Sequence, residues 1–321
     1  KRYGYSWQHL ESIVKKSRAA IVGVSSLFTA YSGEAVETAS RVKKALPECV
    51  VVVGGHHATE MPRKVMECKD VDFVIRGEGE ESFALLVHRL FVGESCADVP
   101  GIVYRTEGGE IVVDDVPAVV EEPDSFPVPA FDLVERRWYS RGKSGAAVVV
   151  ASRGCPMKCS YCSMASSNVP YRKKSVAKVL EEIRQAVEAM DAGFIDFEDE
   201  NISLDKQWFQ ELLCGIIDGY GTGSLELRAM NGLFTPSLDE KTIGLMKAAG
   251  FRTLNLSVGS SCEERLRQFR RPNVVGNLDK VVSAAIRNGM DAVCYMIAGA
   301  PGQTAEESLA DLAYLAKRPV L

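Results

Sequence analysis

The chain has 321 residues, of which 46% are hydrophobic and 25% charged, and its formal net charge is −5 at pH 7. This composition is typical of globular proteins and predicts about two domains, while the acidic balance argues against a nucleic-acid-binding protein. No apolar run approaches the roughly twenty residues that a membrane span needs, and the N-terminus lacks a signal-peptide pattern.

The first ninety residues alternate between strand and helix patterns. Continuous apolar runs, expected for strands buried on both faces, cover residues 19–26, 49–53 and 71–75. Helical patterns cover residues 7–17, 33–46, 59–69 and 82–91. This alternation predicts a doubly wound α/β sheet, in which ligands bind beyond the carboxyl ends of the strands.

Small and polar residues follow these predicted strands. They are Ser25 and Leu27, then Gly54, Gly55, His56 and His57, then Gly77, Glu78, Gly79 and Glu80. Glycines at a strand end let a backbone approach a flat ligand, although turn chemistry also explains them. We interpret the two histidines as polar loop residues or hydrogen-bond donors rather than metal ligands. The glutamates could serve acid–base chemistry or simply favour a helix N-terminus.

The spacing of Ser25-x-Leu27 and Gly54-Gly55 resembles the second and third parts of the cobalamin (B12)-binding fold. Residues 54–59 and 77–80 also resemble stretches of B12-binding radical SAM proteins. The resemblance implies a partial Rossmann-like (flavodoxin-like) cobalamin-binding domain over residues 1–93. Its first part, D-x-H-x-x-G, would precede Lys1, so we expect the N-terminal strand and helix to be missing. The residues implied for cobalamin are Ser25, Leu27, Gly54, Gly55, His56, Gly77 and Glu78.

Residues 94–143 have a different character. Apolar runs at 102–105 and 110–113, joined by Glu107-Gly108-Gly109, predict a hairpin. Residues 122–129 are rich in proline and cannot continue a helix. We interpret this region as a hairpin followed by an ordered linker between two domains.

Strand and helix patterns alternate again from residue 144 onward. Predicted strands cover residues 146–151, 194–197, 225–229, 253–258 and 291–298, and predicted helices cover 175–190, 206–217, 239–249, 277–288 and 305–317. These are five βα units, and residues 319–321 would begin a sixth strand. In an α/β barrel the chemistry takes place at the carboxyl ends of the strands.

Three cysteines follow the first strand of this second region at a C-x3-C-x2-C spacing, namely Cys155, Cys159 and Cys162. Thiolates are soft ligands suited to iron–sulfur clusters, and three can hold three irons of a cubane. Structural zinc usually has four ligands, and disulfide frameworks belong to small secreted chains. The six other cysteines are scattered and are interpreted as reduced thiols, so we expect a cytoplasmic protein.

This motif, with Tyr161 before its last cysteine, resembles that of the radical SAM enzymes. The resemblance implies a partial (β/α)6 radical SAM barrel over residues 144–321, with its last strand missing. It also implies a [4Fe-4S] cluster on the three cysteines, whose open iron binds S-adenosylmethionine (SAM).

The resemblance further assigns residues to SAM. Tyr161 would lie near the adenine, and Glu198 or Glu200 would meet the amino group, although the sequence does not decide which one faces inward. Arg271 would pair with the SAM carboxylate, and the adjacent Arg270 is the alternative candidate. Residues 298–302 resemble a G-x-P-G segment against which adenine lies, so Met296, Ile297 and Gly299 are implied there. Relatives often carry Glu where this chain has Ser257.

The two implied domains together suggest a function. The resemblance implies reductive cleavage of SAM to a 5′-deoxyadenosyl radical, with cobalamin as methyl donor to an unactivated carbon. We expect a B12-dependent radical SAM methyltransferase. The alternatives are a radical cyclase of the anaerobic porphyrin type and a cobalamin-binding sensor or carrier without catalysis. Expected partners are a natural-product, lipid or tetrapyrrole substrate and an electron donor such as flavodoxin or ferredoxin.

Overall fold

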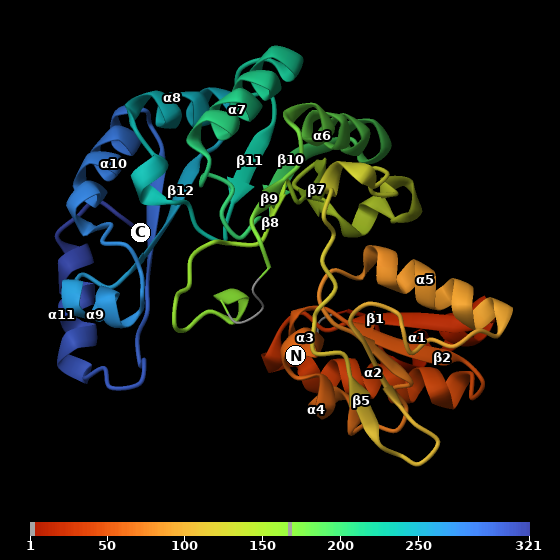
Figure 1. Ribbon diagram of the computed structural model, residues 1–321. Helices are drawn as coiled ribbons and strands as arrows, with labels where there is room; N and C mark the ends of the chain where they lie inside the picture. The colour runs from red at the N-terminus through yellow and green to blue at the C-terminus, as the bar shows by residue number, and fades with distance from the viewer. Residues whose placement is uncertain (1–3, 166–168) are drawn as a thin grey trace. The chain divides into compact units, whose positions relative to one another are not determined.

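The computed structural model describes residues 4–165 and 169–321. The chain divides into two compact units, residues 1–121 and residues 122–321. Figure 1 shows the first unit in red to yellow and the second in yellow through green to blue. Each unit has its own buried apolar core.

The first unit is built on one mixed sheet. Its strands, in spatial order, are β1 (Ile21–Ser25), β2 (Val50–Gly54), β3 (Phe73–Ile75), β4 (Ile102–Arg105) and β5 (Ile111–Val113). The first three are parallel to one another, and the last two are antiparallel additions. Val51 and Val53 of β2 enter one core cluster, whereas Val52 enters another on the opposite face. This alternation explains the uninterrupted apolar run, because both faces are covered.

Helices pack on both faces of this sheet. They are α1 (Trp7–Ser17), α2 (Ser32–Ala45), α3 (His56–Glu60), α4 (Pro62–Met66) and α5 (Gly79–Val92). The single helix predicted over residues 59–69 is wrong, because the chain forms the separate helices α3 and α4. Pro62 opens α4, where its missing N–H costs nothing, and Met61 before it leaves the helical region with ψ 47°.

The hairpin over residues 102–113 forms as predicted, and the structure adds it to the first sheet. Strand β4 pairs with β3 through Ile75 and Ile102, and β5 continues outward from β4. Gly77 also forms a bridge with Ala118. The chain therefore stays with the first unit until residue 121.

The described residues of the second unit form five βα units. Strands β6 (Ser140–Arg141), β7 (Ser144–Val149), β10 (Ala192–Phe197) and β11 (Glu226–Ala229) form one sheet in the order β11-β10-β7-β6, and β12 (Thr253–Gly259) pairs with β13 (Asp291–Met296). The main strands run parallel. Single bridges from Leu227 to Phe251 and from Leu233 to Leu256 connect the two sheets, so the strands follow one another as in an open barrel.

Helices line the outside of this curved sheet (Figure 1). They are α6 (Val176–Met190), α7 (Lys206–Tyr220), α8 (Glu240–Ala249), α9 (Glu263–Gln268), α10 (Val275–Arg287) and α11 (Ala305–Ala316). The side chains of Ser175, Asp205, Asp239 and Thr304 accept backbone hydrogen bonds at the starts of α6, α7, α8 and α11. Helix α9 was not predicted, because six residues are too few for a clear helical period.

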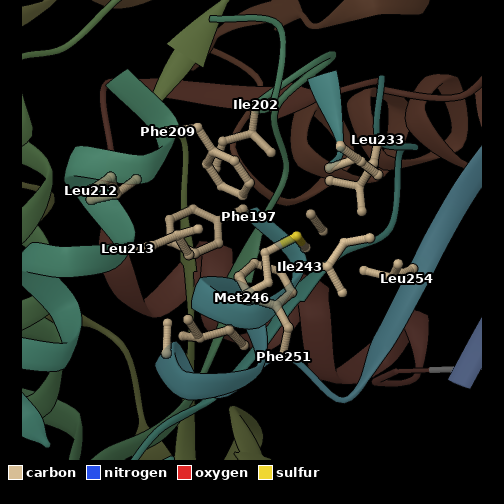
Figure 2. Packing of buried hydrophobic residues seen from close by; sticks show 14 of the residues in the cluster. Phe197, Ile202, Phe209, Leu212, Leu213, Leu233, Ile243, Met246, Phe251 and Leu254 are labelled. Carbon is tan, nitrogen blue, oxygen red and sulfur yellow. The ribbon is translucent and has the colours of Figure 1, made fainter. Parts of the chain in front are cut away.

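Aromatic side chains fill the core between strand β10 and its helices. The rings of Phe197 and Phe251 are stacked with centroids 6.4 Å apart, and Phe209 meets Phe251 edge-on at 6.3 Å. Figure 2 shows these rings with Ile202, Met246 and Leu254 around them. Such packing holds the strand ends in fixed positions.

No helix in the described parts of the chain combines the length and apolar character that a bilayer crossing demands.

Candidate functional site

The cysteine motif of the second unit lies between the two strands of a short antiparallel ladder. After β7, strand β8 (Ser152–Arg153) pairs antiparallel with β9 (Arg172–Lys173), and the three cysteines lie between them in the sequence. Gly154 has φ 75°, and a Cβ there would lie 2.9 Å from the carbonyl carbon of Pro170. Only glycine fits this conformation without strain, which explains the Gly before Cys155.

The three cysteines line one cavity of about 270 Å³, which we call the cysteine pocket. Its other walls come from the cysteine loop itself, from the segments that follow β10 and β11, from β12 and from the chain after α9. They are Met157, Tyr161, Met164, Glu200, Asn201, Asn231, Gly232, Leu233, Phe234, Ser257 and Arg271. The structure thus brings polar groups from several strand ends to one place, as expected for a barrel.

The acidic run after β10 divides among three surroundings. Glu200 lines the cysteine pocket. Glu198 is exposed and accepts a hydrogen bond from Nδ2 of Asn231 at 3.1 Å. Asp199 is buried and turns away toward Ala151 and Ser152. Of the two glutamates, Glu200 therefore faces the cysteine pocket. Glu198 contacts only Asn231, which itself lines the pocket.

Tyr161 and Arg271 contact each other at the pocket wall. Nη1 of Arg271 donates to the Tyr161 hydroxyl at 2.8 Å, and Nη2 donates to the carbonyl of Ser257. The Tyr161 ring meets Phe269 edge-on at 5.3 Å. Burial raises the pKa of Tyr161, although the neighbouring Arg271 opposes this shift. Of the two arginines, Arg271 lines the pocket, whereas Arg270 is exposed and does not.

The residues present fit an iron–sulfur cubane. All three thiols are free, and burial raises the pKa of Cys155 while a backbone N–H from Met157 opposes that shift. Among the described residues, no three His, Cys, Asp or Glu side chains converge closely enough for a single metal ion. A cubane needs no such convergence, because each thiolate binds a different iron.

The pocket also offers polar groups that fit a ligand such as SAM. The Asn201 amide oxygen and the Arg271 Nε are buried and have no hydrogen-bond partner. Buried polar groups are normally paired, so these two atoms mark places where a ligand can bind. Sequence reasoning gave no role to Asn201 and Asn231, although they stand only four and two residues after predicted strand ends.

The three remaining residues predicted for SAM lie at the end of β13. Met296 packs partly against the core, and Ile297 donates its backbone N–H to the Gly259 carbonyl at 2.8 Å. Gly299 has φ 76° in the turn that follows. The structure does not place these three residues among those that line the cysteine pocket.

The first unit contains a second cavity, of about 260 Å³, at the carboxyl end of its parallel strands. Four predicted cobalamin residues line it, together with residues that sequence reasoning did not select. The lining is Gly23, Val24, Ser25, Val52, Gly54, Gly55, Ile75, Gly77, Gly79 and Phe83. We call it the glycine pocket. A Cβ on Gly23 would lie 3.6 Å from the Phe83 ring, so the absence of a side chain at Gly23 leaves room beside this ring.

The other three residues predicted for cobalamin lie outside this lining. Leu27 is 51% exposed beyond β1, and His56 is exposed at the start of α3. Glu78 accepts a hydrogen bond from the backbone N–H of Val120 at 2.7 Å. His57, in contrast, is buried, and its Nδ1 lies 3.1 Å from the Thr29 hydroxyl. The glycine-lined, mainly apolar slot fits a flat ring of a cofactor.

Two family models match the chain. Residues 3–87 match the B12 binding domain, and residues 149–314 match the Radical SAM superfamily. The second match covers the cysteine pocket, and the first covers the glycine pocket.

Named relatives and solved structures agree with these matches. An uncharacterized methyltransferase of Pyrococcus horikoshii, PH0819, is 28% identical over 97% of this chain and 67% of its own length. The anaerobic magnesium-protoporphyrin IX monomethyl ester cyclase of Rubrivivax gelatinosus is 27% identical over 89% of this chain and 52% of its own. The methyltransferase TsrM of Kitasatospora setae, solved with cobalamin and a [4Fe-4S] cluster, has the same fold, with a TM-score of 0.78 at 20% identity over 97% of this chain and 62% of its own.

This chain thus spans between about half and two thirds of the length of these relatives. The predicted α/β fold class, a cobalamin-binding domain followed by a radical SAM barrel, is confirmed, whereas the missing strands expected at its two ends stay a prediction. The two family models also support the predicted cofactors, a [4Fe-4S] cluster, SAM and cobalamin. The chain belongs to the radical SAM superfamily and carries a B12 binding domain ahead of its barrel.

Proposed function

We propose that this chain is the cofactor-binding part of a cobalamin-dependent radical SAM methyltransferase that acts on an unactivated carbon. The observation that carries the proposal is the cysteine pocket, where three free thiols meet Glu200, Asn201 and Arg271. A binding module or sensor has no need for such a set. PH0819 and TsrM, both called methyltransferases, support this reaction class.

In this proposal Cys155, Cys159 and Cys162 hold the cluster and leave one iron open. When bound, the cluster supplies the electron that cleaves SAM, and cobalamin supplies the methyl group. Glu200 accepts a hydrogen bond from the SAM amino group, and Arg271 pairs with its carboxylate. Glu198 acts only through Asn231. Tyr161, held by Arg271, borders the adenine, with Met296, Ile297 and Gly299 on the side of β13.

For cobalamin we propose that the glycine pocket accepts the nucleotide tail. Ser25, Gly54, Gly55 and Gly77 line it, and the exposed Leu27 and His56 follow Ser25 and Gly55 closely in the sequence. Glu78 holds the backbone of Val120 beside Gly77. The nine free thiols support a reducing compartment such as the cytoplasm, and the cluster requires an electron donor such as flavodoxin or ferredoxin.

The test compares Cys159→Ala with Cys262→Ala after anaerobic reconstitution with iron, sulfide and hydroxocobalamin. Cys262 is exposed and lies outside the cysteine pocket, so it is a matched control. We expect about four irons per chain in the wild-type protein and in the control. With dithionite and SAM, both should form 5′-deoxyadenosine, and Cys159→Ala should form none. Wild-type rates in Cys159→Ala would refute the enzymatic proposal.

The cyclase is kept as a second candidate because the Rubrivivax gelatinosus enzyme matches 89% of this chain. Methyl-labelled SAM separates the two candidates. In a methyltransferase the label moves from SAM to the protein-bound corrinoid fraction, whereas a cyclase leaves that fraction unlabelled.

A further inference from the structure

We propose that Asp199 is a positioning residue that fixes the base of the cysteine segment, residues 155–162, and so sets the geometry of the cluster. This inference rests on the proposed function, because it assumes that the three cysteines hold a cluster. It concerns a carboxylate that lines neither pocket and has no part in the proposed chemistry.

The contacts of Asp199 all converge on the chain just before the cysteines. Its Oδ2 accepts the backbone N–H of Ala151 at 3.2 Å. Its Oδ1 accepts the hydroxyl of Ser152 at 2.5 Å and also the backbone N–H of Ser152. One carboxylate therefore holds two consecutive residues at the junction between β7 and β8. Its three donors are all uncharged groups. The position of the Asp199 carboxylate is therefore set by the directions of hydrogen bonds rather than by attraction to a charged partner.

Burial makes this arrangement rigid. Asp199 is 3% exposed, Ser152 1% and Ala151 0%. An amide in place of the carboxylate presents one oxygen where two are used, so at least one buried N–H would lose its acceptor. Water cannot easily compensate for this loss, because the site is closed.

The anchored residues lead directly to the cluster ligands. Ser152 and Arg153 form β8, which pairs with β9, and Gly154 then turns tightly against Pro170 into Cys155. On the other side, the backbone N–H of Lys174 donates to the Ala151 carbonyl at 2.9 Å. Both ends of the ladder thus meet at Ala151, beside Asp199. A displacement of this point moves β8, and Cys155 follows only three residues after Ser152.

Asp199 also couples two parts of the cysteine pocket. Glu200, its neighbour in the sequence, lines the pocket from the segment after β10, and Cys155 lines it from the loop after β8. Because Asp199 fixes the first relative to the second, its substitution should change the surroundings of the cluster without removing a ligand.

The experiment compares Asp199→Asn with Asp196→Asn. Asp196 is the matched control, since it is also a buried aspartate of this strand region, 5% exposed, but its partner is Arg228 on β11. Both variants are reconstituted anaerobically with iron and sulfide, and iron content, the electron paramagnetic resonance (EPR) spectrum after dithionite and the midpoint potential are measured. Asp199→Asn should hold at least twofold less iron per chain and show a shifted spectrum and potential. Asp196→Asn should match the wild type in all three.

A further variant, Ser152→Ala, removes only the hydroxyl donor and keeps the backbone bonds. It should fold and should shift the spectrum in the same direction as Asp199→Asn, by a smaller amount. If Asp199→Asn does not fold, this variant decides the question alone. Wild-type spectra and iron content in Ser152→Ala, or in a folded Asp199→Asn, would overturn the inference. Failure of the wild-type protein to form a cluster would instead overturn the proposed function.

Discussion

The two pockets of this chain are built in opposite ways. The glycine pocket of the first unit is lined by five residues without side chains on or just after its parallel strands, namely Gly23, Gly54, Gly55, Gly77 and Gly79. The cysteine pocket of the second unit exists because strand ends present thiol, carboxylate, amide and guanidinium groups. The first site should therefore be sensitive to added atoms, and the second to removed or altered ones.

The largest expected effect tests whether the glycine-pocket region is sensitive to an added atom. Gly77 has φ 82°, and a Cβ there would lie 2.7 Å from the Ala118 nitrogen and closer still to its carbonyl oxygen. Gly77→Ala should lower the free energy of unfolding by about 3 kcal/mol or more, because backbone strain and a backbone clash add. Urea denaturation measures this change in the free energy of unfolding. Gly79→Ala is the control, since its Cβ would meet only Ile75 at 3.7 Å. Equal stability of the two variants would contradict the expectation.

The second prediction concerns an altered group in the cysteine pocket. Arg271 reaches both Tyr161 and Ser257 with one planar guanidinium, and a lysine cannot make both bonds. Arg271→Lys should weaken SAM binding by roughly 10- to 100-fold, in the range of a lost charge-assisted hydrogen bond. Equilibrium dialysis of reconstituted protein measures this. Arg270→Lys, which changes the exposed neighbour, should bind SAM normally, and a similar loss in both variants would place SAM elsewhere.

The third prediction separates binding from stability in the glycine pocket. Gly23 has no positive φ, and a Cβ would meet Phe83 at an ordinary contact distance of 3.6 Å. Gly23→Ala should change the free energy of unfolding by less than about 1 kcal/mol. It should nevertheless weaken cobalamin binding about tenfold, because the methyl group occupies ligand space. Gly33→Ala, with nothing within 4 Å of its Cβ, should leave affinity unchanged. Unaltered affinity in Gly23→Ala would move the cofactor away from this slot.

The last prediction concerns a pH dependence of stability near the cysteine pocket. Burial raises the pKa of Asp199 to about 7, although hydrogen bonds from Ser152 and Ala151 lower it. Between the ordinary pKa of 3.8 and about 7, the folded protein holds a proton that the unfolded chain has lost. Stability should therefore fall as pH rises through this window, by at most about 1.4 kcal/mol per pH unit.

This contribution is isolated by subtracting the unfolding curves of Asp199→Asn from those of the wild type. The difference should decline from about pH 4 to about pH 7 and then level off, since the amide does not titrate. A flat difference would show that the burial of Asp199 does not govern its protonation.

Local patterns predicted most of the strands and helices, because continuous apolar runs and helical periods survive in the folded chain. They did not predict where the acidic run 198–200 would point. That depends on β10 ending at Phe197 and on donors at Ala151 and Ser152, nearly fifty residues earlier. The pocket asparagines were missed for a similar reason, since an amide has no spacing rule comparable to the three cysteines.

The buried ion pair between Lys174 and Glu182 has a consequence for how the holoprotein is assembled. Lys174 follows β9 directly, its ammonium lies 2.7 Å from the Glu182 carboxylate, and Trp208 binds its carbonyl at 3.0 Å. The returning end of the ladder is thus attached to α6 and α7 independently of Asp199. Because both ends are anchored to completed barrel elements, iron and sulfide can be loaded onto a finished scaffold, and maturation of the protein need not wait for its metal.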